Sequence, residues 1–445
     1  MVPLPVQGHS NQLLHLSRLL STHALPVHFV GTATLIRQVK TRVHGWDPSS
    51  SAAMHFHEFP TPEFENPPPN PNPPSSRFPT HLGPPVIAAA TSLRQPVYEL
   101  VTKLSTEYKK VVIIFDFYMS CTIQDTRLIE NTIAYRFLCA PAFTNFSFYW
   151  ENESEPPEFI EYTIQQLQSR TNFFGDIYDT SRVIEPVYIE MIEKRKSSGA
   201  QQVWALGPLN PVSIPDTKTR HECLDWLDRQ EPDSVIFISF GTTVSVTNEE
   251  IEAIALGLEK SEQKFIWVLR DADTANVFTD GVRKLTDILP LGFEKKVKDR
   301  GLILTDWAPQ LEILAHEATG GFMSHCGWNS CSESITMGVP IAAWPMHSDQ
   351  PRNAFFITEG LRIGVEVVSW ERRNEKVSSD IVEKAVRKLM ASEEGEEIRK
   401  RAKELGVAVR ESFKEGGVAR KELDSLIAHI MSSVSYSVSS CVSSI

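Results

Sequence analysis

The sequence contains no apolar run long enough to span a bilayer. Its first 20 residues also lack the basic segment and the uninterrupted apolar stretch of a secretory signal. Six cysteines in 445 residues are too few for a disulfide scaffold, so reduced thiols and a cytoplasmic location are expected. Basic residues are in deficit, with 44 Lys and Arg against 56 Asp and Glu, and a net charge of -12 argues against a protein that binds the nucleic acid backbone.

Two common nucleotide-binding motifs are missing as well. No G-x-G-x-x-G follows a predicted strand, which disfavours a dinucleotide-binding enzyme, and the absence of G-x-x-x-x-G-K-[ST] excludes a P-loop. Cys326 and Cys331 lie near His325 and His347, but their spacing does not match the common structural zinc sites. The acidic triplet at 271–273 is too short to identify a metal site. We therefore expect no metal.

Both halves of the chain alternate short apolar segments with longer amphipathic ones. This alternation predicts βαβ units with parallel sheets, and therefore an α/β fold. A chain of 445 residues is long enough for two domains. Composition divides it into a first domain at 1–205, a linker rich in Pro and polar residues at 206–222, a second domain at 223–431 and a Ser-rich tail at 432–445.

Individual elements can be placed from local patterns. Thr247 and Glu250 have the spacing of a capping box, which predicts a helix from Asn248 to Lys260. Proline dominates residues 60–85, which predicts a long surface loop. Strands are predicted near Val2–Leu4, Val27–Val30, Met54–Phe59 and Val111–Phe115, and at SVIFISF, KFIWVL, LILT, GFMSH, PIAAW and GVEVV in the second half.

Polar residues at predicted strand exits are candidate site residues, because ligands of doubly wound sheets bind beyond the carboxyl ends of the strands. His9 follows a short strand and a glycine turn, just before an apolar-periodic helix, where it could act as a base near neutral pH. Asp116 ends a buried strand, where a carboxylate is costly unless it is paired, and a histidine partner would satisfy it. From the residues alone, a solvated or helix-capping His9 and a turn-capping Asp116 stay open.

A third strand exit is the stretch HCGWNSCSES at residues 325–334. Free N–H groups and the dipole at the start of the following helix would bind an anion, with His325, Asn329 and Ser330 as further donors. Glu333, one turn into the helix, suits ribose hydroxyls rather than phosphate. A phosphate beside a sugar diol predicts a nucleotide, although an ordinary capped helix stays open.

From Trp307 to Gln350 the chain reads WAPQLEILAHEATGGFMSHCGWNSCSESITMGVPIAAWPMHSDQ. This segment closely resembles the donor-binding box of plant family 1 UDP-glycosyltransferases, PLPVQGH resembles the family's motif around a catalytic His, and VVIIFD resembles the strand with its Asp partner. VPLPVQGHSNQLLHLSRLL and PIAAWPMHSDQPRNA look most like the zeatin O-glucosyltransferase branch. The resemblance implies a GT-B fold, in which two Rossmann-like domains face each other across a cleft. The first would bind the acceptor and the second the UDP-sugar, and a helix near 395–430 would cross back to the first domain.

The resemblance also implies a role for each residue of the donor site, from the base to the sugar. Trp307 would stack on uracil, Ala308 and Gln310 would contact base or ribose, Glu333 would hold the ribose, His325, Asn329, Ser330 and Thr242 would bind the pyrophosphate, and Trp328, Asp349 and Gln350 would contact the sugar. A Gln at the last position of the box is associated in the family with glucose.

The mechanism implied is direct displacement with inversion, with UDP-glucose as co-substrate and neither a cofactor nor a metal. His9 would remove the proton of the acceptor hydroxyl, and Asp116 would stabilise the imidazolium that forms. Charge on the departing UDP would be stabilised by the helix terminus and the donors around it.

Two departures from the family pattern concern the acceptor side. The chain begins almost at the first motif, so either the first strand is short or the sequence is truncated. Phe117 and Tyr118 follow the Asp, where zeatin-type relatives tend to carry a smaller polar residue. These aromatics, with Phe146 and Trp150, would line the acceptor pocket or pack in the core, and they favour a planar or hydrophobic acceptor.

The expected activity is O-glucosylation of a small plant metabolite, either a cytokinin such as zeatin or a flavonoid or other phenolic. Two alternatives stay open: a UDP-sugar epimerase, which shares the GT-B fold, and a non-catalytic binder of UDP-sugar. No membrane or nucleic acid partner is expected, and nothing in the sequence demands an oligomer.

Overall fold

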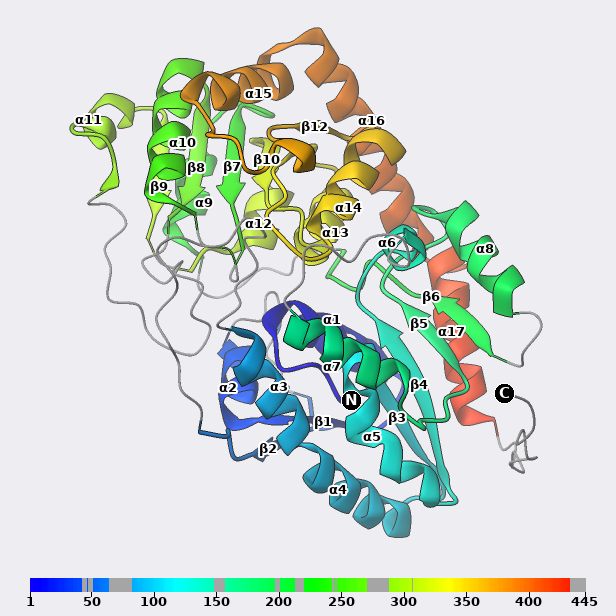
Figure 1. Ribbon diagram of the computed structural model, residues 1–445. Helices are drawn as coiled ribbons and strands as arrows, with labels where there is room; N and C mark the ends of the chain where they lie inside the picture. Colours follow the sequence, from blue (N-terminus) through cyan, green and yellow to red (C-terminus); the bar gives the residue numbers. More distant parts are fainter. Residues whose placement is uncertain are drawn as a thin grey trace.

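Parallel strands form the centre of both halves of the molecule, which lie one above the other in Figure 1. The computed structural model describes residues 1–41, 46, 51–63, 82–147, 157–196, 201–212, 220–241, 244, 246–269, 288–305 and 307–432.

The carboxy-terminal half contains one parallel sheet with the strand order β12-β11-β10-β7-β8-β9. All six strands coincide with the six segments that the sequence predicts for this half. The order reverses between β7 and β10, so the chain leaves these two neighbouring strands toward opposite faces, and a crevice opens at their carboxyl ends. The strands are β7 (Val235–Ser239), β8 (Lys264–Val268), β9 (Gly301–Leu304), β10 (Thr319–Ser324), β11 (Ile341–Ala343) and β12 (Gly364–Glu366).

The amino-terminal half has the order β2-β1 on one side and β3-β4-β5-β6 on the other. Val2 joins the two groups: its N–H donates to Ile114 and its carbonyl accepts from Asp116, each at 2.9 Å, while Met1 O accepts from Val30 N at 3.0 Å. The predicted strand at Val2–Leu4 is therefore reduced to a single bridging residue. The strands are β1 (Val27–Thr32), β2 (Met54–Phe59), β3 (Val111–Asp116), β4 (Thr132–Leu138), β5 (Gly175–Tyr178) and β6 (Gln202–Ala205).

Strands β4, β5 and β6 are absent from the sequence prediction. The segments of β5 and β6 have only four residues each, and β4 reads TIAYRFL, with a charge in its centre. That charge is tolerated because Arg136 of β4 forms an ion pair with Asp176, its register neighbour on β5.

Helices cover the faces of both sheets. The predicted capping box is confirmed, since Thr247 accepts from Glu250 N and the Glu250 side chain accepts from Thr247 N at the start of α10. The helices are α1 (Gln7–Ser21), α2 (Ala33–Thr41), α3 (Gly83–Ser92), α4 (Arg94–Glu107), α5 (Ser120–Ile123), α6 (Ala142–Ser147), α7 (Pro157–Leu167), α8 (Pro186–Lys196), α9 (Glu222–Leu227), α10 (Asn248–Ser261), α11 (Phe293–Val297), α12 (Gln310–Ala315), α13 (Trp328–Met337), α14 (Gln350–Phe355), α15 (Ser379–Ala391), α16 (Glu393–Ser412) and α17 (Val418–Met431).

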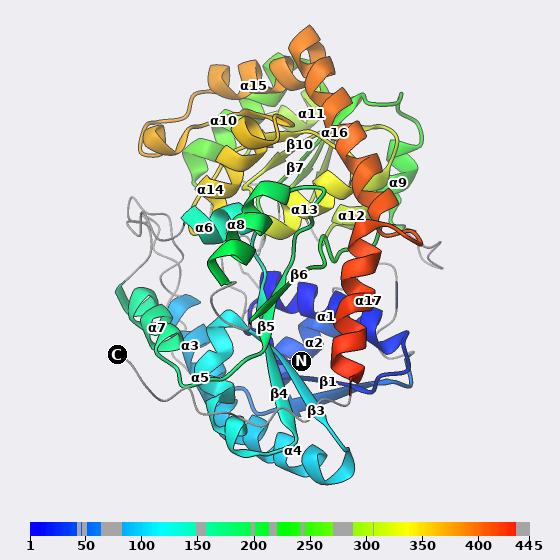
Figure 2. The ribbon, with the colours of Figure 1, turned by 90° about the vertical axis from the view of Figure 1, so that its right-hand side faces the viewer.

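The last helix, α17, lies against the amino-terminal half, beside β6 (Figure 2). Leu426 is fully buried in one apolar cluster with residues of α1 and β1 and with Tyr135 of β4. Polar contacts add to the packing: the Tyr135 hydroxyl lies 2.6 Å from His429 Nδ1, and Arg182 Nε donates to Glu422 at 2.6 Å. The final helix therefore fastens the carboxy-terminal half of the chain to the amino-terminal half.

Direct hydrogen bonds also join the halves across the cleft. Asn329 of α13 donates to Gly8 O at 2.9 Å and accepts from Gln12 Nε2 at 2.7 Å. On the other side of the cleft, Thr144 of α6 donates to Asn353 of α14 at 2.8 Å. The Asn329 contacts hold the first turns of α1 against the start of α13, and the Thr144 contact holds α6 against α14.

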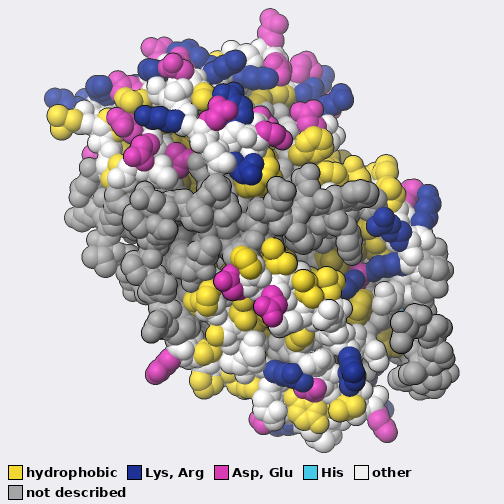
Figure 3. All heavy atoms as spheres, in the orientation of Figure 1, with side chains coloured by type: hydrophobic (Ala, Val, Ile, Leu, Met, Phe, Trp, Pro, Cys, Tyr) yellow, Lys and Arg dark blue, Asp and Glu magenta, His cyan; other side chains and the backbone are white. Residues whose placement is uncertain are grey.

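Basic and acidic side chains are intermixed over the upper half of the surface in Figure 3. None of the helices in the described part of the chain combines the length and the apolar composition needed to cross a membrane.

The packing of α17 leads to a stability prediction. Replacing Leu426 by Ala should lower the free energy of unfolding by about 2–5 kcal/mol, because it leaves a cavity in the cluster that α17 shares with α1. The readout is the urea midpoint followed by circular dichroism. Val407→Ala on α16 is the matched control, since 51% of that residue is exposed. An unchanged midpoint in Leu426→Ala would contradict the anchoring role of α17.

Candidate active site

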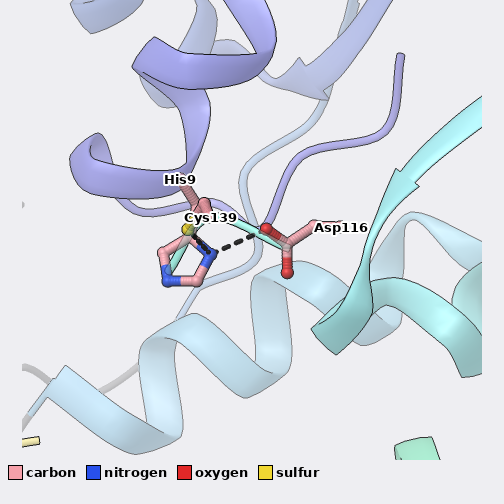
Figure 4. A group of neighbouring side chains, drawn as sticks. All are labelled: His9, Asp116 and Cys139. Atoms are coloured by element: carbon pink, nitrogen blue, oxygen red, sulfur yellow. Dashed lines mark hydrogen bonds and ion pairs between the residues drawn. The ribbon is translucent and has the colours of Figure 1, made fainter. Parts of the chain in front are cut away.

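His9 and Asp116 lie next to each other and are joined by a hydrogen bond (Figure 4). His9 Nδ1 lies 2.7 Å from Asp116 Oδ2, and Asp116 Oδ1 accepts from Tyr118 N at 2.9 Å. The Asp116 side chain is 2% exposed and that of His9 is 26% exposed. The carboxylate therefore takes the proton of Nδ1, and Nε2, the ring nitrogen turned away from Asp116, is left for a ligand.

The sheet topology explains this meeting. His9 follows the Val2 segment and Asp116 ends β3, and these two strands are neighbours at the point where the order of the amino-terminal sheet reverses. The sequence predicts His9 just before a helix. In the structure α1 begins at Gln7, so His9 lies in its first turn. The pair is thus fixed by the two chain segments that diverge from the crevice.

Cys139, just after β4, is a third member of this cluster, and the sequence prediction does not include it. Its Sγ lies 3.0 Å from His9 Nδ1. The nearest ligand atoms of His9, Asp116 and Cys139 lie within 4.8 Å of one another, a spacing that would admit one metal ion, but the hydrogen bond to Asp116 accounts for the arrangement without one. A sequence signal was lacking, because a lone cysteine after a polar strand has no pattern.

The charge state of the pair follows from its surroundings. Burial alone would lower the pKa of His9, but the charge of Asp116, together with Cys139, outweighs burial and raises that pKa well above its usual value. Burial raises the pKa of the Cys139 thiol to about 11, so this thiol keeps its proton at neutral pH. Because a protonated thiol carries no charge, the rise in the pKa of His9 comes from the charge of Asp116.

A cavity of about 330 Å³ extends from His9 across the start of α13. Both halves contribute to it, and it gathers nearly all the residues predicted for the donor. It is lined by Trp307, Ala308, Gln310, His325, Trp328, Asn329, Ser330, Glu333, Asp349 and Gln350, together with His9.

The amino terminus of α13 faces this cavity. Gly327 precedes the helix, and no side chain caps it, so its first N–H groups are available to an anion. The preceding residue, Cys326, has a φ of 65°, a conformation that is strained for a residue with a side chain. The strand exit and the following helix that the sequence predicts around residues 325–334 are present, and the helix begins at Trp328.

His325 is held as a neutral ring. Burial lowers its pKa to about 3, with a smaller effect from His347. A Cβ atom on Gly241 or Gly327 would lie 2.7 or 2.5 Å from its imidazole, so both glycines are needed for its position. Nδ1 is buried and has no hydrogen-bond partner among the described residues. A ligand oxygen in the cavity would satisfy it.

Glu333, Gln310 and Ser330 form a polar group deeper in the cavity. Gln310 Nε2 donates to Glu333 Oε2 at 2.8 Å and to Ser330 Oγ at 3.0 Å. Burial raises the pKa of Glu333 to about 7, although the hydrogen bond from Gln310 opposes the rise. Trp307 stands at the wall with 39% of its surface exposed, as a stacking platform requires.

Two predicted donor residues are already engaged by the opposite half. The Trp328 indole donates to Asp179 O at 2.7 Å, and both ends of the Asn329 amide are bonded to Gly8 and Gln12. The indole N–H of Trp328 is therefore not available to a sugar hydroxyl, since Asp179 occupies it.

Asp349 and Gln350 lie at the end of the donor cavity nearest the other half of the site. Gln350 Oε1 accepts from the backbone N–H groups of Met346 and His347 at 2.9 and 3.0 Å. Asp349 accepts from Asn353 at 2.8 Å, and burial raises its pKa. The Gln350 oxygen is thus fixed, and its amide nitrogen lies 3.4 Å from both ring nitrogens of His347, at the wall of the donor cavity.

A second cavity, of about 590 Å³, opens on the other side of His9. Phe117 and Tyr118, for which the sequence leaves an acceptor pocket and core packing open, both line this cavity, and Tyr118 packs edge-on against His9 with 5.8 Å between ring centroids. His9 and Asp349 line both cavities. Thr242, Trp150 and the side chain of Phe146 lie outside the described residues.

The chain matches two known families in succession. Residues 1–211 match the family described as glycosyltransferase, N-terminal domain, and residues 216–398 match UDP-glucoronosyl and UDP-glucosyl transferase.

Curated relatives match over nearly the whole chain. Zeatin O-glucosyltransferase of Phaseolus lunatus is 49% identical over 97% of this chain and 96% of its own. Zeatin O-xylosyltransferase of Phaseolus vulgaris is 46% identical over 97% of each chain.

A solved structure, UGT2 of Phytolacca americana complexed with UDP-2fluoro-glucose and pterostilbene, has a TM-score of 0.77 and 23% identity, over 97% of this chain and 99% of its own. This likeness confirms the GT-B fold expected from the sequence. With the near full-length relatives, the conclusion is that the chain belongs to the plant UDP-glycosyltransferases, in the zeatin O-glycosyltransferase branch, and is a UDP-sugar-dependent O-glycosyltransferase of small plant metabolites.

Proposed function

We propose that the enzyme transfers glucose from UDP-glucose to a hydroxyl group of a zeatin-type cytokinin or of a phenolic, with inversion at the anomeric carbon. The observation that carries this proposal is the position of His9. Its side chain lines both cavities, so a sugar donor on one side and a hydroxyl acceptor on the other would meet at its ring.

The reaction follows from this position. His9 Nε2 takes the proton of the acceptor hydroxyl while Nδ1 keeps its hydrogen bond to Asp116. The acceptor oxygen forms a bond to the anomeric carbon as the bond from that carbon to the UDP oxygen breaks. The proton remains on His9, and the imidazolium is stabilised by the Asp116 carboxylate. One displacement on an α-linked donor gives a β-glucoside.

The donor cavity suits UDP-glucose from end to end. Trp307 stacks on the uracil, Glu333 accepts from the ribose hydroxyls, and the first N–H groups of α13 with His325 bind the pyrophosphate. Gln350 and Asp349 bind the sugar. Thr242, which lies outside the described residues, is assigned to the phosphates from the family resemblance alone. The helix terminus and these donors stabilise the charge on the leaving UDP, so transfer needs no metal.

The acceptor class rests on the second cavity and on the relatives. The aromatic walls given by Phe117, Tyr118 and Phe159 suit a planar acceptor. Phe146 and Trp150 are proposed for the same pocket from the sequence alone. One relative is a zeatin O-xylosyltransferase, so UDP-xylose is the second candidate donor. An epimerase would need no aromatic acceptor cavity beside His9, and a mere binder would need no His9–Asp116 pair.

The domain limits and the location are part of the same proposal. The acceptor domain comprises residues 1–205 and the donor domain 223–431, joined by a linker at 206–222 and followed by the tail at 432–445. The described cysteines, Cys121, Cys139, Cys223, Cys326 and Cys331, are all unpaired, which suits the reducing cytoplasm.

The function is tested with UDP-glucose and a panel of zeatins, flavonoids and simple phenols, with products identified by mass spectrometry. A product one hexose heavier than the acceptor is expected. His9→Ala should reduce its rate by roughly 10²–10⁴ because the base is lost, yet bind UDP-glucose as before. His23→Ala, in the turn after α1, is the control. Normal turnover in His9→Ala would exclude this residue as the base.

Asp116→Asn sharpens the same test through pH. The Asp116 charge keeps the pKa of His9 high, and only the neutral imidazole can act as a base, so kcat/KM should rise with pH through that raised pKa. Without the charge, the pKa of His9 falls. The rise in kcat/KM should then move to lower pH while its plateau falls. An unmoved profile would contradict the pairing.

Glu333 leads to a separate prediction for donor binding. Its pKa of about 7 means that the carboxylate forms as the pH rises from 6 to 8, and only the carboxylate accepts from both ribose hydroxyls well. The affinity for UDP-glucose, measured by calorimetry, should therefore increase over this range. Glu333→Gln should be roughly tenfold weaker at pH 8 and independent of pH. The exposed Glu317→Gln is the control. A persisting pH dependence in Glu333→Gln would refute the assignment.

A further inference from the structure

The acceptor cavity has a basic side that the proposed reaction does not use. Arg136 of β4 and Lys196, the last residue of α8, both line it. Both side chains contact Asp176 of β5, whose carboxylate has no exposed surface. Arg136 alone satisfies this carboxylate, since Nε and Nη2 donate to its two oxygens at 2.9 Å each.

Lys196 is therefore a surplus cation. One buried carboxylate faces two basic side chains, so protonation of Lys196 leaves an excess of positive charge at the cavity wall. Arg195, an exposed residue that also lines the cavity, adds to the positive potential. Among the described residues that line this cavity, the acidic ones are Asp116 and Asp349, and both lie at the opposite end, beside His9.

Keeping this cation in place is unfavourable in the empty cavity. Burial, together with the positive charge of the neighbouring Arg136, lowers the pKa of Lys196 to about 7. The Lys196 side chain remains 18% exposed and that of Arg136 remains 21% exposed. An ammonium group has three donors, and the contact with Asp176 uses one, so donors remain for a ligand.

The separation from His9 can be taken from the strand. Arg136 lies three residues before Cys139, so the Cα atoms of Arg136 and Cys139 are about 10 Å apart. Cys139 in turn marks the position of His9, because its Sγ contacts His9 Nδ1. Phe117 lines the wall on the way, with its ring 5.8 Å from the Arg136 guanidinium. An aromatic ring with a short side chain spans this distance.

We propose that Arg136 and Lys196 form an anion subsite in the acceptor cavity, and that favoured acceptors carry a carboxylate across an aromatic body from the hydroxyl that is glycosylated. This inference rests on the proposed function, because it assigns the second cavity to the acceptor. It makes Lys196 a specificity-determining residue for the reaction.

The test compares 3-(4-hydroxyphenyl)propionate with its methyl ester, which differ in the charge at one end. Binding of each to the UDP-saturated enzyme is measured by calorimetry, and kcat/KM is measured with UDP-glucose. The wild-type enzyme should bind the acid roughly tenfold more tightly than the ester. Lys196→Met should abolish this preference by weakening the acid alone, since Arg136 still satisfies Asp176 and the fold is retained.

Two further variants complete the test. Lys196→Arg should restore the preference for the acid, and Lys194→Met, on the same helix but exposed, should leave it unchanged. Equal binding of acid and ester by the wild type would overturn the proposal, as would a Lys196→Met variant that loses affinity for both alike. Formation of the hexose adduct of the ester tests the proposed function separately, because the ester does not need the anion subsite.

Discussion

The catalytic arrangement depends on one topological constraint, namely that two parallel sheets present their points of strand-order reversal to each other. In the amino-terminal sheet the reversal lies between the Val2 segment and β3, and it brings together His9 and Asp116. In the other sheet it lies between β7 and β10, and it opens the cavity under α13. Asn329, which bonds Gly8 and Gln12, keeps these two crevices in contact. Moving α1 away from α13 would separate His9 from the donor cavity, even with every residue of the site unchanged.

The two histidines of the site have opposite pKa shifts, although burial alone would lower the pKa of both. His9 is beside a carboxylate that raises its pKa, so the imidazolium formed during transfer is stabilised. Among the described residues His325 has no such partner, and burial keeps its ring neutral, with Nδ1 lacking a hydrogen bond to any of them. A neutral ring can meet a phosphate oxygen without a competing proton equilibrium near pH 7. One histidine is thus suited to exchange a proton and the other to hold its position.

The sequence was most informative where local pattern and position in the fold coincide. The six strands of the carboxy-terminal half are apolar runs, and the segment from Trp307 to Gln350 carries a family resemblance, so the fold and most of the donor cavity were predictable. Cys139 and the Arg136–Asp176 pair were not, because both depend on β4 and β5, whose short or charged segments give no strand pattern. Nor could the sequence show that the Trp328 indole bonds Asp179, since that contact joins segments 149 residues apart.

The central claim, a single displacement assisted by His9, is tested most directly by the configuration of the product. Proton NMR of the glucoside formed from UDP-α-glucose reports this configuration through the coupling of the anomeric proton. The account predicts a β-glucoside from the first turnover onward. An α-glucoside would contradict it, because retention requires a second displacement and a covalent intermediate for which His9 and Asp116 provide no role.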